Sequence, residues 1–321
     1  MLIFNECFFN KNDYEKDRFV DIKKITSQEI CLYCDKDYHM PQHIFFIDNY
    51  RGVNLFGRKT ISALSTENKI NSTHCSMITC HMILGVLKDY AYENRNIMIE
   101  YYPLTKGEKV AIFRDLSKDR LVNIFYPFLY KDFATGNENK ITALSGWSFN
   151  PKRLINLSHG EEHFRQFTIE LIKDYYFEGI VIYDPACSTG EFLYTLKQKY
   201  NGCVTIGHDM SSEMVEYAKD FLDYYSCVNA INSPVDDGSV DMLFLRFLNS
   251  EITTKEEAKL YFMVLYKKVK AGGHIICFGH TSVLLEVDFI KLLGMDIISC
   301  NGYCSDRDAL FQYYILKNTG C

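Results

Sequence analysis

After residue 150, apolar and polar positions alternate in a pattern that predicts strands and helices in turn. The predicted strands are short apolar runs, and the helices between them carry apolar residues three and four positions apart. Strands are expected over 180–184, 203–208, 225–229, 240–245, 274–278, 295–300 and 310–317, and helices from Ser158, over 190–200, from Ser211, between Thr253 and Gly272, and over 284–293. This alternation predicts an α/β fold with a mostly parallel sheet and helices on both faces.

Two of these helix starts carry the capping-box pattern. In that pattern a hydroxyl side chain accepts from the backbone three residues on, and a glutamate there reaches back to the first residue. The two segments are Ser158-His159-Gly160-Glu161 and Thr253-Thr254-Lys255-Glu256. We therefore expect one helix to begin at each of them.

The first 150 residues show a weaker pattern, with strand-like runs around one helical stretch over 76–92. The runs lie at 29–33, 43–48, 96–101, 110–113 and 121–125. Turn-forming residues gather over 135–140 and 145–151, which places a domain boundary near 150. Residues 1–150 are thus predicted to form an N-terminal α+β domain, and residues 151–321 the α/β domain.

Composition narrows the class of protein and its partners. The chain is 47% hydrophobic and 24% charged, as globular proteins are. Its net charge of −6 leaves no broad basic face, so nucleic acid is not expected as a partner. It lacks an apolar stretch long enough to span a bilayer, and its 12 cysteines come without a secretory leader. We expect a cytoplasmic protein with reduced thiols and no membrane partner.

The candidate chemistry begins where the first strand of the second half ends. This strand closes on Asp184, and the chain turns through Pro185-Ala186-Cys187-Ser188-Thr189-Gly190 into a helix. Small residues let the backbone approach a ligand, to which a helix start offers N–H groups. A dinucleotide fold would carry G-x-G-x-x-G here, whereas this turn keeps only Gly190. An uncharged or cationic ligand is favoured over a pyrophosphate.

Nineteen residues after Gly190, the next strand ends in Asp209, which is placed to bind both hydroxyls of a ribose. Two further segments follow, "P-x-x-D-G-S-x-D" from Pro234 and "K-x-G-G" from Lys270. Together with the turn and the "G-x-D-x-S-x-x-M" segment around Asp209, they stand in the order that resembles the class I S-adenosylmethionine-dependent methyltransferases. The resemblance covers about 158–317. It implies a Rossmann-like sheet of seven strands, the last antiparallel, with S-adenosyl-L-methionine as cofactor and S-adenosyl-L-homocysteine as product.

The resemblance also implies roles for single residues. Asp184 would lie near the amino acid part of the cofactor, and Asp209 would bind its ribose. Asn229 matches an acid that commonly accepts from the adenine amino group, a bond that its amide oxygen could also accept. Ala186 and Ser188 replace glycines of the usual turn. The implied cofactor-binding set is Asp184, Ala186, Ser188, Gly190, Asp209, Met210, Asn229 and Arg246.

The segment after the fourth strand bears on the acceptor. DNA adenine methyltransferases have an N-P-P-Y-type motif there to hold a flipped base. This chain reads Leu245-Arg246-Phe247-Leu248-Asn249, which is similar to small-molecule methyltransferases such as those of natural-product biosynthesis. The resemblance thus implies methyl transfer to a small-molecule acceptor by in-line displacement. Alternatives are a nucleic-acid or protein methyltransferase, a transferase of the donor's aminocarboxypropyl group, and a non-catalytic cofactor-binding module.

No catalytic residue is assigned from the sequence. Asn249 and His280 follow strands four and five, whose loops reach the methyl group in this fold, so they are candidates for a general base, with loop capping as the alternative role. The N-terminal domain is expected to form a wall of the acceptor pocket or a homodimer surface.

A second motif has the spacing of a zinc site. Cys31, Cys34, His39 and His43 follow C-x2-C-x4-H-x3-H and could supply four ligands. The two cysteines fall in a predicted strand, where side chains alternate between faces and these two diverge. No metal is therefore expected.

Overall fold

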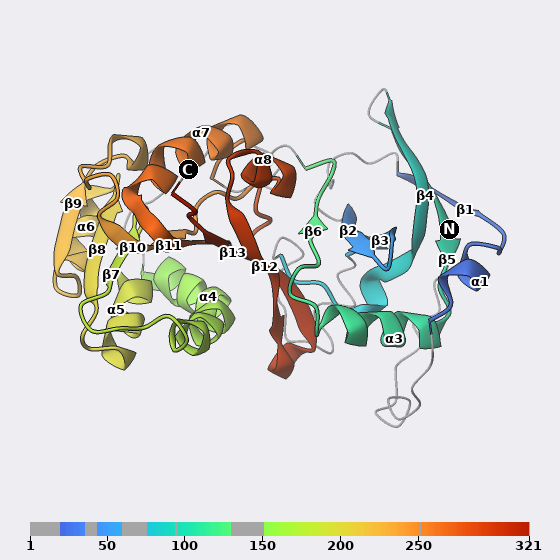
Figure 1. Cartoon of the computed structure of the whole chain (residues 1–321), viewed down its shortest axis with the longest axis horizontal. Helices are drawn as coiled ribbons and strands as arrows, with labels where there is room; N and C mark the ends of the chain where they lie inside the picture. Colours follow the sequence, from blue (N-terminus) through green and yellow to red (C-terminus); the bar gives the residue numbers. More distant parts are fainter. Residues whose placement is uncertain are drawn as a thin grey trace.

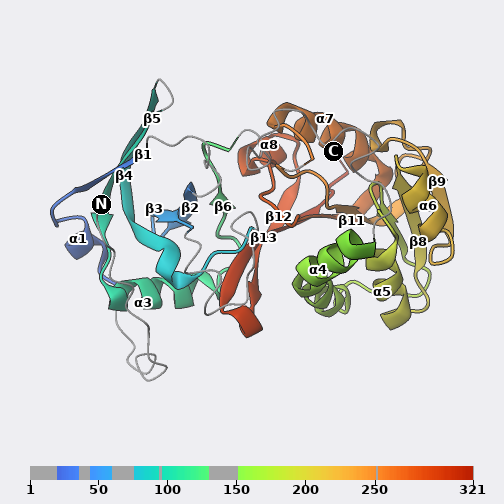
Figure 2. The same ribbon diagram turned by 180° about the vertical axis from the view of Figure 1, so that it is seen from behind.

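The computed structural model describes residues 20–35, 44–59, 76–93, 96–129, 151–250 and 252–320, with side chains from residue 161 onward in the helix that begins at residue 151. It contains two sheets built from the two halves of the chain (Figure 1). The view from behind shows the same arrangement, with the C-terminal half and its helices at one end and the N-terminal sheet at the other (Figure 2). No helix in the described part is long and apolar enough to cross a membrane.

The C-terminal sheet has seven strands in the order β12-β13-β11-β10-β7-β8-β9. Strands β7 to β11 pair in parallel, while β13 runs antiparallel to both β11 and β12. The strands are β7 Val181–Asp184, β8 Val204–Asp209, β9 Tyr224–Cys227, β10 Val240–Leu245, β11 Val269–Cys277, β12 Asp296–Cys304 and β13 Ala309–Lys317. The predicted Rossmann-like sheet with an antiparallel last strand is confirmed.

The helices of this half lie between its strands, except the first, which precedes β7. They are α4 Pro151–Ile172, α5 Glu191–Lys199, α6 Ser212–Ala218, α7 Lys255–Leu265 and α8 Val287–Leu292, with short 3-10 turns η5 Ala230–Asn232, η6 Tyr266–Lys268 and η7 Ser305–Arg307. The predicted positions of both capping boxes were wrong. Helix α4 is already helical at Pro151, so Ser158 does not begin it. Helix α7 is capped one residue later than predicted, by the reciprocal pair Thr254 and Glu257.

The N-terminal half forms an antiparallel sheet of six strands in the order β1-β5-β4-β3-β2-β6. The strands are β1 Cys31–Asp35, β2 Ile44–Tyr50, β3 Val53–Arg58, β4 Ile83–Glu93, β5 Asn96–Pro103 and β6 Ile124–Phe125, accompanied by α1 Ile22–Ile25, η3 Cys80–Met82 and α3 Lys106–Leu116. The predicted mixture of strands and helix is confirmed, but several elements differ from the prediction.

The predicted helix over 76–92 is wrong, because most of that stretch is strand β4. Pairing with neighbouring strands decides this: a Cβ on Gly85 would lie 2.3 Å from the carbonyl oxygen of Tyr102 on β5, so this glycine permits the close approach. The predicted strand over 110–113 is also wrong, since it lies inside α3. Only Ile124–Phe125 is strand within 121–125, and β3 was not predicted.

The two sheets meet along buried hydrogen bonds between β6 and the β12–β13 hairpin. The Gln312 side chain, fully buried on β13, donates to the Ile124 carbonyl (2.8 Å) and accepts from the Val283 N–H (2.9 Å). The hydroxyl of Tyr314 donates to the amide oxygen of Asn123 (3.0 Å). One hydrophobic core runs through both halves. The predicted division near residue 150 stays a prediction, and residues 130–150 lie outside the described part.

Candidate functional site

The turn after β7 is tightly folded around the buried carboxylate of Asp184. Its Oδ1 accepts from the Ala186 N–H at 3.0 Å. Gly190 has φ +75°, and Ser188 also adopts a left-handed conformation, with φ +53°. A Cβ on Gly190 would lie 3.1 Å from the Cβ of Ala218 on α6. Glycine at position 190 thus serves both the backbone conformation and the close approach of α6.

Four of the five N–H groups of this turn are bonded inside the protein. Two of them donate within the turn, to the carboxylate of Asp184 and the carbonyl of Cys187. The other two reach β8, where they donate to the carbonyl of His208 (2.7 Å) and the carboxylate of Asp209 (2.9 Å). The donors are the backbone nitrogens of Ala186, Cys187, Ser188 and Gly190. These four groups do not form a phosphate cradle, which agrees with the expected preference for an uncharged or cationic ligand.

Asp209 ends β8 and ties that strand to the turn. Its Oδ2 accepts from the Ser188 N–H and its Oδ1 from the Ser211 N–H, both at 2.9 Å. Burial raises the pKa of Asp209, and these two N–H bonds oppose the rise. Each carboxylate oxygen keeps a further lone pair, so the half-buried carboxylate can still accept from two hydroxyl groups. This arrangement fits a ribose.

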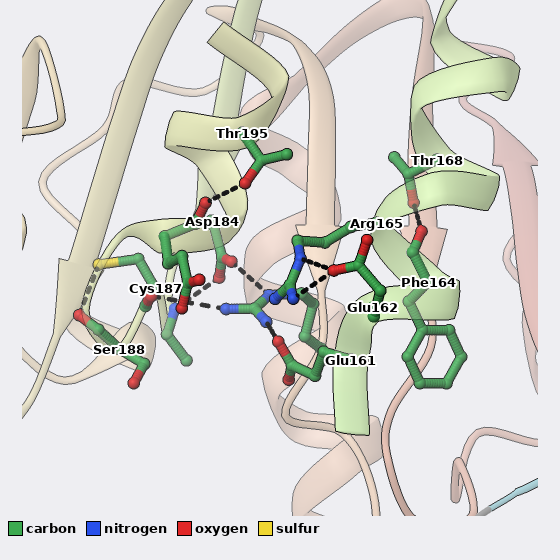
Figure 3. A network of polar contacts seen from close by, with 12 residues as sticks. Glu161, Glu162, Phe164, Arg165, Thr168, Asp184, Cys187, Ser188 and Thr195 are labelled. Atoms are coloured by element: carbon green, nitrogen blue, oxygen red, sulfur yellow. Dashed lines mark hydrogen bonds and ion pairs between the residues drawn. The ribbon is translucent and has the colours of Figure 1, made fainter. Parts of the chain in front are cut away.

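A buried arginine links the turn to α4. Asp184, Glu161 and Cys187 converge on one guanidinium from β7, α4 and the turn (Figure 3). Arg246 Nε lies 2.7 Å from Asp184 Oδ2, Nη1 lies 2.8 Å from Glu161 Oε2, and Nη2 lies 3.5 Å from the Cys187 carbonyl oxygen. The guanidinium also lies 4.6 Å from the ring centre of Phe192. Ion pairs and a cation–π contact therefore fix Arg246.

Burial and charge oppose one another in this cluster. Burial raises the pKa of Asp184, whereas the charge of Arg246 and its hydrogen bond favour the ionised carboxylate. Burial lowers the pKa of Arg246, but Asp184 and Glu161 outweigh it and leave the pKa above its ordinary value. The guanidinium therefore keeps its charge. With two carboxylates around one cation, and Asp209 close by on β8, the site carries an excess of negative groups that suits a cationic ligand.

Asn229 follows the carboxyl end of β9, next to the carboxyl end of β8. The Val228 N–H donates to the Asp209 carbonyl at 2.9 Å, which holds this segment beside the end of β8. The Asn229 amide oxygen accepts from the Ile231 N–H (3.1 Å) and from the Tyr261 hydroxyl (3.2 Å). Both bonds use the oxygen that was expected to accept from an adenine amino group. The structure thus gives this oxygen a different set of partners.

The remaining predicted residues follow the carboxyl ends of β8, β10 and β11. Met210, next to Asp209, is 41% exposed. Asn249 is buried, and its amide group donates to the Arg246 carbonyl and accepts from the Thr281 hydroxyl, both at 2.9 Å. The His280 carbonyl accepts from the Ser76 N–H of the N-terminal half (3.0 Å). These contacts favour loop-fastening for Asn249, while a catalytic role for either candidate stays a prediction.

Two of the four candidate zinc ligands lie in the described part of the chain. Cys31 and Cys34 lie three positions apart on β1, opposite Tyr101 and Met98 of β5, so their side chains leave opposite faces of the strand. His39 and His43 lie outside the described residues. Over the part of the chain that the structure describes, no three His, Cys, Asp or Glu side chains gather as metal ligands.

The sequence itself matches a known family at this site. Residues 182–273, which include the turn, Asp209, Asn229 and Arg246, match a family model described as a methyltransferase domain. The C-terminal half contains a class I S-adenosylmethionine-dependent methyltransferase domain. The resemblance stated from the motifs is confirmed for this half.

A relative that also spans the N-terminal half is isonocardicin synthase from Nocardia uniformis subsp. tsuyamanensis. It is 28% identical over 281 residues, which cover 86% of this chain and 92% of the relative. The similarity therefore extends well beyond the methyltransferase domain, and the relative is named for its product and not for a methyl transfer.

Solved structures similar to this chain include three methyltransferases. One, from Leishmania major, is 14% identical, with a TM-score of 0.44 over 55% of this chain and 81% of its own. A second, from Aquifex aeolicus, is 16% identical, with a TM-score of 0.40 over 53% of this chain and 100% of its own. The plantazolicin methyltransferase, solved with S-adenosylhomocysteine, is 13% identical, with a TM-score of 0.41 over 55% of this chain and 93% of its own.

Two residues of the methyltransferase domain site were not recognised from the sequence. Glu161 was interpreted as part of a helix cap, yet its carboxylate pairs with Arg246, 85 positions away. Tyr261 lies on α7 and reaches Asn229 across 32 positions. Neither contact has a local sequence signal, because each depends on how a helix packs beside the sheet.

Proposed function

We propose that this chain transfers a group from S-adenosylmethionine to a small-molecule nucleophile, with the methyl group as the first candidate. The observation that carries the proposal is the bond between Asp209 and the Ser188 N–H. It joins the turn after β7 to the acid at the end of β8, the two segments from which the family builds its cofactor site. The match to a methyltransferase domain over 182–273 supports the same assignment.

The residues present fit the amino acid part of this cofactor, which carries both an ammonium and a carboxylate. An arginine has five N–H groups, and three of those on Arg246 are bonded inside the protein. The remaining ones can donate to the carboxylate. Glu161 accepts from Arg246 through Oε2, so its other oxygen can accept from the ammonium. Both ends of the amino acid part would thus find a group of opposite charge among these two residues.

When bound, S-adenosylmethionine supplies a carbon activated by a sulfonium, to which a nucleophile bonds as the carbon–sulfur bond breaks and its electrons return to a neutral sulfur. The chain's own residues hold the ends of the cofactor and exclude water. The excess of carboxylates among Asp184, Glu161 and Asp209 favours binding of the positive charge. The acceptor's proton leaves to solvent or to a base on the loops after β10 and β11.

The aminocarboxypropyl group is a second candidate for transfer. The relative that spans both halves of the chain is named a synthase, which supports a reaction other than methylation. Arg246 and Glu161 would hold the amino acid part whichever carbon reacts, so they favour neither group. The N-terminal half is proposed to form a wall of the acceptor pocket, since Ser76 bonds to the loop at His280.

The experiment that tests this proposal follows both groups at once. The full chain is incubated with S-adenosylmethionine labelled either in the methyl or in the carboxyl carbon, together with a panel of small phenols, amines and carboxylic acids. Methyl transfer leaves S-adenosylhomocysteine, whereas aminocarboxypropyl transfer leaves 5′-methylthioadenosine. We expect one of the two labels to enter an acceptor with its matching nucleoside. Cofactor consumption no greater than that of Asp209→Ala, across the whole panel, would sink the proposal.

A further inference from the structure

The amide oxygen of Asn229 has no lone pair left for a ligand. It accepts from the Ile231 N–H at 3.1 Å and from the Tyr261 hydroxyl at 3.2 Å. An amide oxygen has two lone pairs, and these two bonds use both of them.

The orientation of this amide group is fixed by its neighbours. Oxygen and nitrogen of an asparagine side chain are assigned from the hydrogen bonds around them. The Ile231 N–H can only donate, so the atom that faces it must be the oxygen. The amide nitrogen, Nδ2, is the other branch of the planar amide group and points away from the Ile231 N–H. Asn229 is half-buried, and none of the hydrogen bonds found in the described part of the chain uses this nitrogen.

Tyr261 is itself held in place. Its ring packs edge-on against Phe247, with ring centres 5.1 Å apart. Phe247 follows Arg246 in the loop after β10, so α7 and this loop together position the hydroxyl that bonds to Asn229. The tyrosine proton points at the amide oxygen, because that oxygen can only accept.

Asn229 lies where the base of a bound nucleoside would be recognised. The segment is joined to the end of β8 by the bond from the Val228 N–H to the Asp209 carbonyl, at 2.9 Å. Asp209 is the proposed ribose ligand, and in open α/β sheets ligands bind beyond the carboxyl ends of the strands. A base attached to that ribose would meet Asn229 next.

We propose that Asn229, oriented by Tyr261, presents an N–H donor to the six-membered edge of the purine in place of the acceptor that selects an adenine amino group. This rests on the proposed function. A donor can bond to N1 of adenine or to the carbonyl oxygen of a 6-oxo purine. The site therefore accepts purine nucleosides with either an amino or an oxo group at position 6.

Calorimetry of the full chain tests this with two probes. They are S-adenosyl-L-homocysteine and its deaminated analogue S-inosyl-L-homocysteine, which differ only in the 6-substituent and the proton on N1. The wild-type chain is expected to bind both with dissociation constants within about threefold of each other, a difference smaller than one hydrogen bond contributes.

Two variants separate this inference from its alternatives. Asn229→Asp supplies a free acceptor oxygen, so it should favour the adenine nucleoside by about tenfold or more. Tyr261→Phe keeps the ring against Phe247 but frees one lone pair of the Asn229 oxygen. It should shift the preference toward the adenine nucleoside by a few fold. If the Tyr261 oxygen accepted the adenine amino group instead, the same variant would shift the preference the other way and contradict the inference.

The wild-type result separates the two proposals. Binding of both nucleosides with a preference of more than about tenfold for the adenine form would overturn this inference and leave the proposed function standing. Binding of neither would overturn both. Thermal unfolding of each variant checks that it is folded, and an unchanged preference in a folded Asn229→Asp chain would also contradict the inference.

Discussion

Arg246 is a cation held away from water by carboxylates from two different elements. Asp184 comes from β7 and is fully buried, and Glu161 comes from α4. Replacing the arginine would leave the Asp184 carboxylate in the interior without a countercharge. An uncompensated buried charge destabilises a folded protein, so the stability that each residue contributes depends on the presence of the other.

Arg246→Met is therefore expected to lower the free energy of unfolding by about 3–5 kcal/mol. Adding Asp184→Asn to it should recover part of that loss, because the second change removes the stranded charge. Urea unfolding of the wild type and both variants at pH 7 provides the measurement. A loss below about 1 kcal/mol in Arg246→Met would show that the ion pair is not structural.

His208 is a second buried titratable group, on the strand that ends in Asp209. Its Nδ1 lies 3.0 Å from the hydroxyl of Tyr183, which donates to Ser233 Oγ at 2.7 Å. Burial lowers the pKa of His208 from 6.5 to about 4. The folded state thus keeps the imidazole neutral over a range in which the unfolded chain protonates it.

The sign of the resulting pH dependence follows from linkage. With a lowered folded-state pKa, the stabilisation is present above pH 6.5 and is lost as the pH falls toward about 4. His208→Asn should flatten the fall in unfolding free energy between these two values. Parallel urea titrations of variant and wild type from pH 7.5 downward give the difference. Parallel curves at every pH would contradict the assignment.

At the scale of elements, the loops after β10 and β11 are fastened by Asn249. Its amide group bonds to the Arg246 carbonyl and to the Thr281 hydroxyl, both at 2.9 Å. A Cβ on Gly279 would lie 2.8 Å from the Asn249 amide nitrogen, so the loops also approach closely there. The side chain therefore holds the backbone of Arg246 against the second loop.

Asn249→Ala is expected to reduce the free energy of unfolding by about 1–3 kcal/mol, because it removes two buried hydrogen bonds. Thr281→Val, which removes only one of the two bonds, should cost less. Chemical unfolding of both variants is the measurement. If Asn249 acted as the base instead, Asn249→Ala would abolish group transfer while the unfolding midpoint stayed at the wild-type value.

How well the elements could be predicted differs between the halves. In the C-terminal half, strands such as Val181–Asp184 are short apolar runs ended by an acid, and their pairing is fixed by the helices between them. In the N-terminal half, Ile83–Glu93 has apolar spacing that also suits a helix, and its strand form depends on pairing with β3 and β5. A local signal was available for α3, since Thr105 and Glu108 form a capping box.

The candidate site divides in the same way. Asp184, Asp209 and Gly190 stand at motif positions close in sequence, so they could be placed from the sequence alone. Glu161 and Tyr261 act through helices that pack onto the sheet from far along the chain. The bond from Tyr261 to the Asn229 oxygen could not be foreseen for this reason, whereas the bond from the Ile231 N–H is local.

At the scale of the whole molecule, the two sheets share a buried polar junction. Gln312 on β13 bonds to the Ile124 carbonyl of β6 and to the Val283 N–H. Asn301 donates to the Val122 carbonyl at 2.7 Å. The bonds from Gln312 to Ile124 and from Asn301 to Val122 join residues more than 170 positions apart, so no pattern in the sequence could predict them. We expect the two halves to unfold together.

Gln312→Leu should lower the free energy of unfolding by about 1–3 kcal/mol for each buried group that it leaves unbonded. Hydrogen exchange should report the loss in β3 and β4 as well as in β10 and β11, because the junction couples them. Gln166→Leu, the same change at an exposed site on α4, serves as the control and should leave exchange unaltered. Faster exchange confined to one sheet would argue against coupled unfolding.

The central claim is that S-adenosylmethionine binds at the carboxyl ends of β7, β8 and β9. Calorimetric titration of the full chain tests this claim most directly. Asp241, at the amino end of the central strand β10, offers a matched control, since its carboxylate also accepts from a backbone N–H, that of Val181 at 2.9 Å. We predict a dissociation constant on the order of micromolar for the wild type, retained in Asp241→Ala and lost in Asp209→Ala. No measurable binding by the wild type, or equal binding by Asp209→Ala, would contradict the claim.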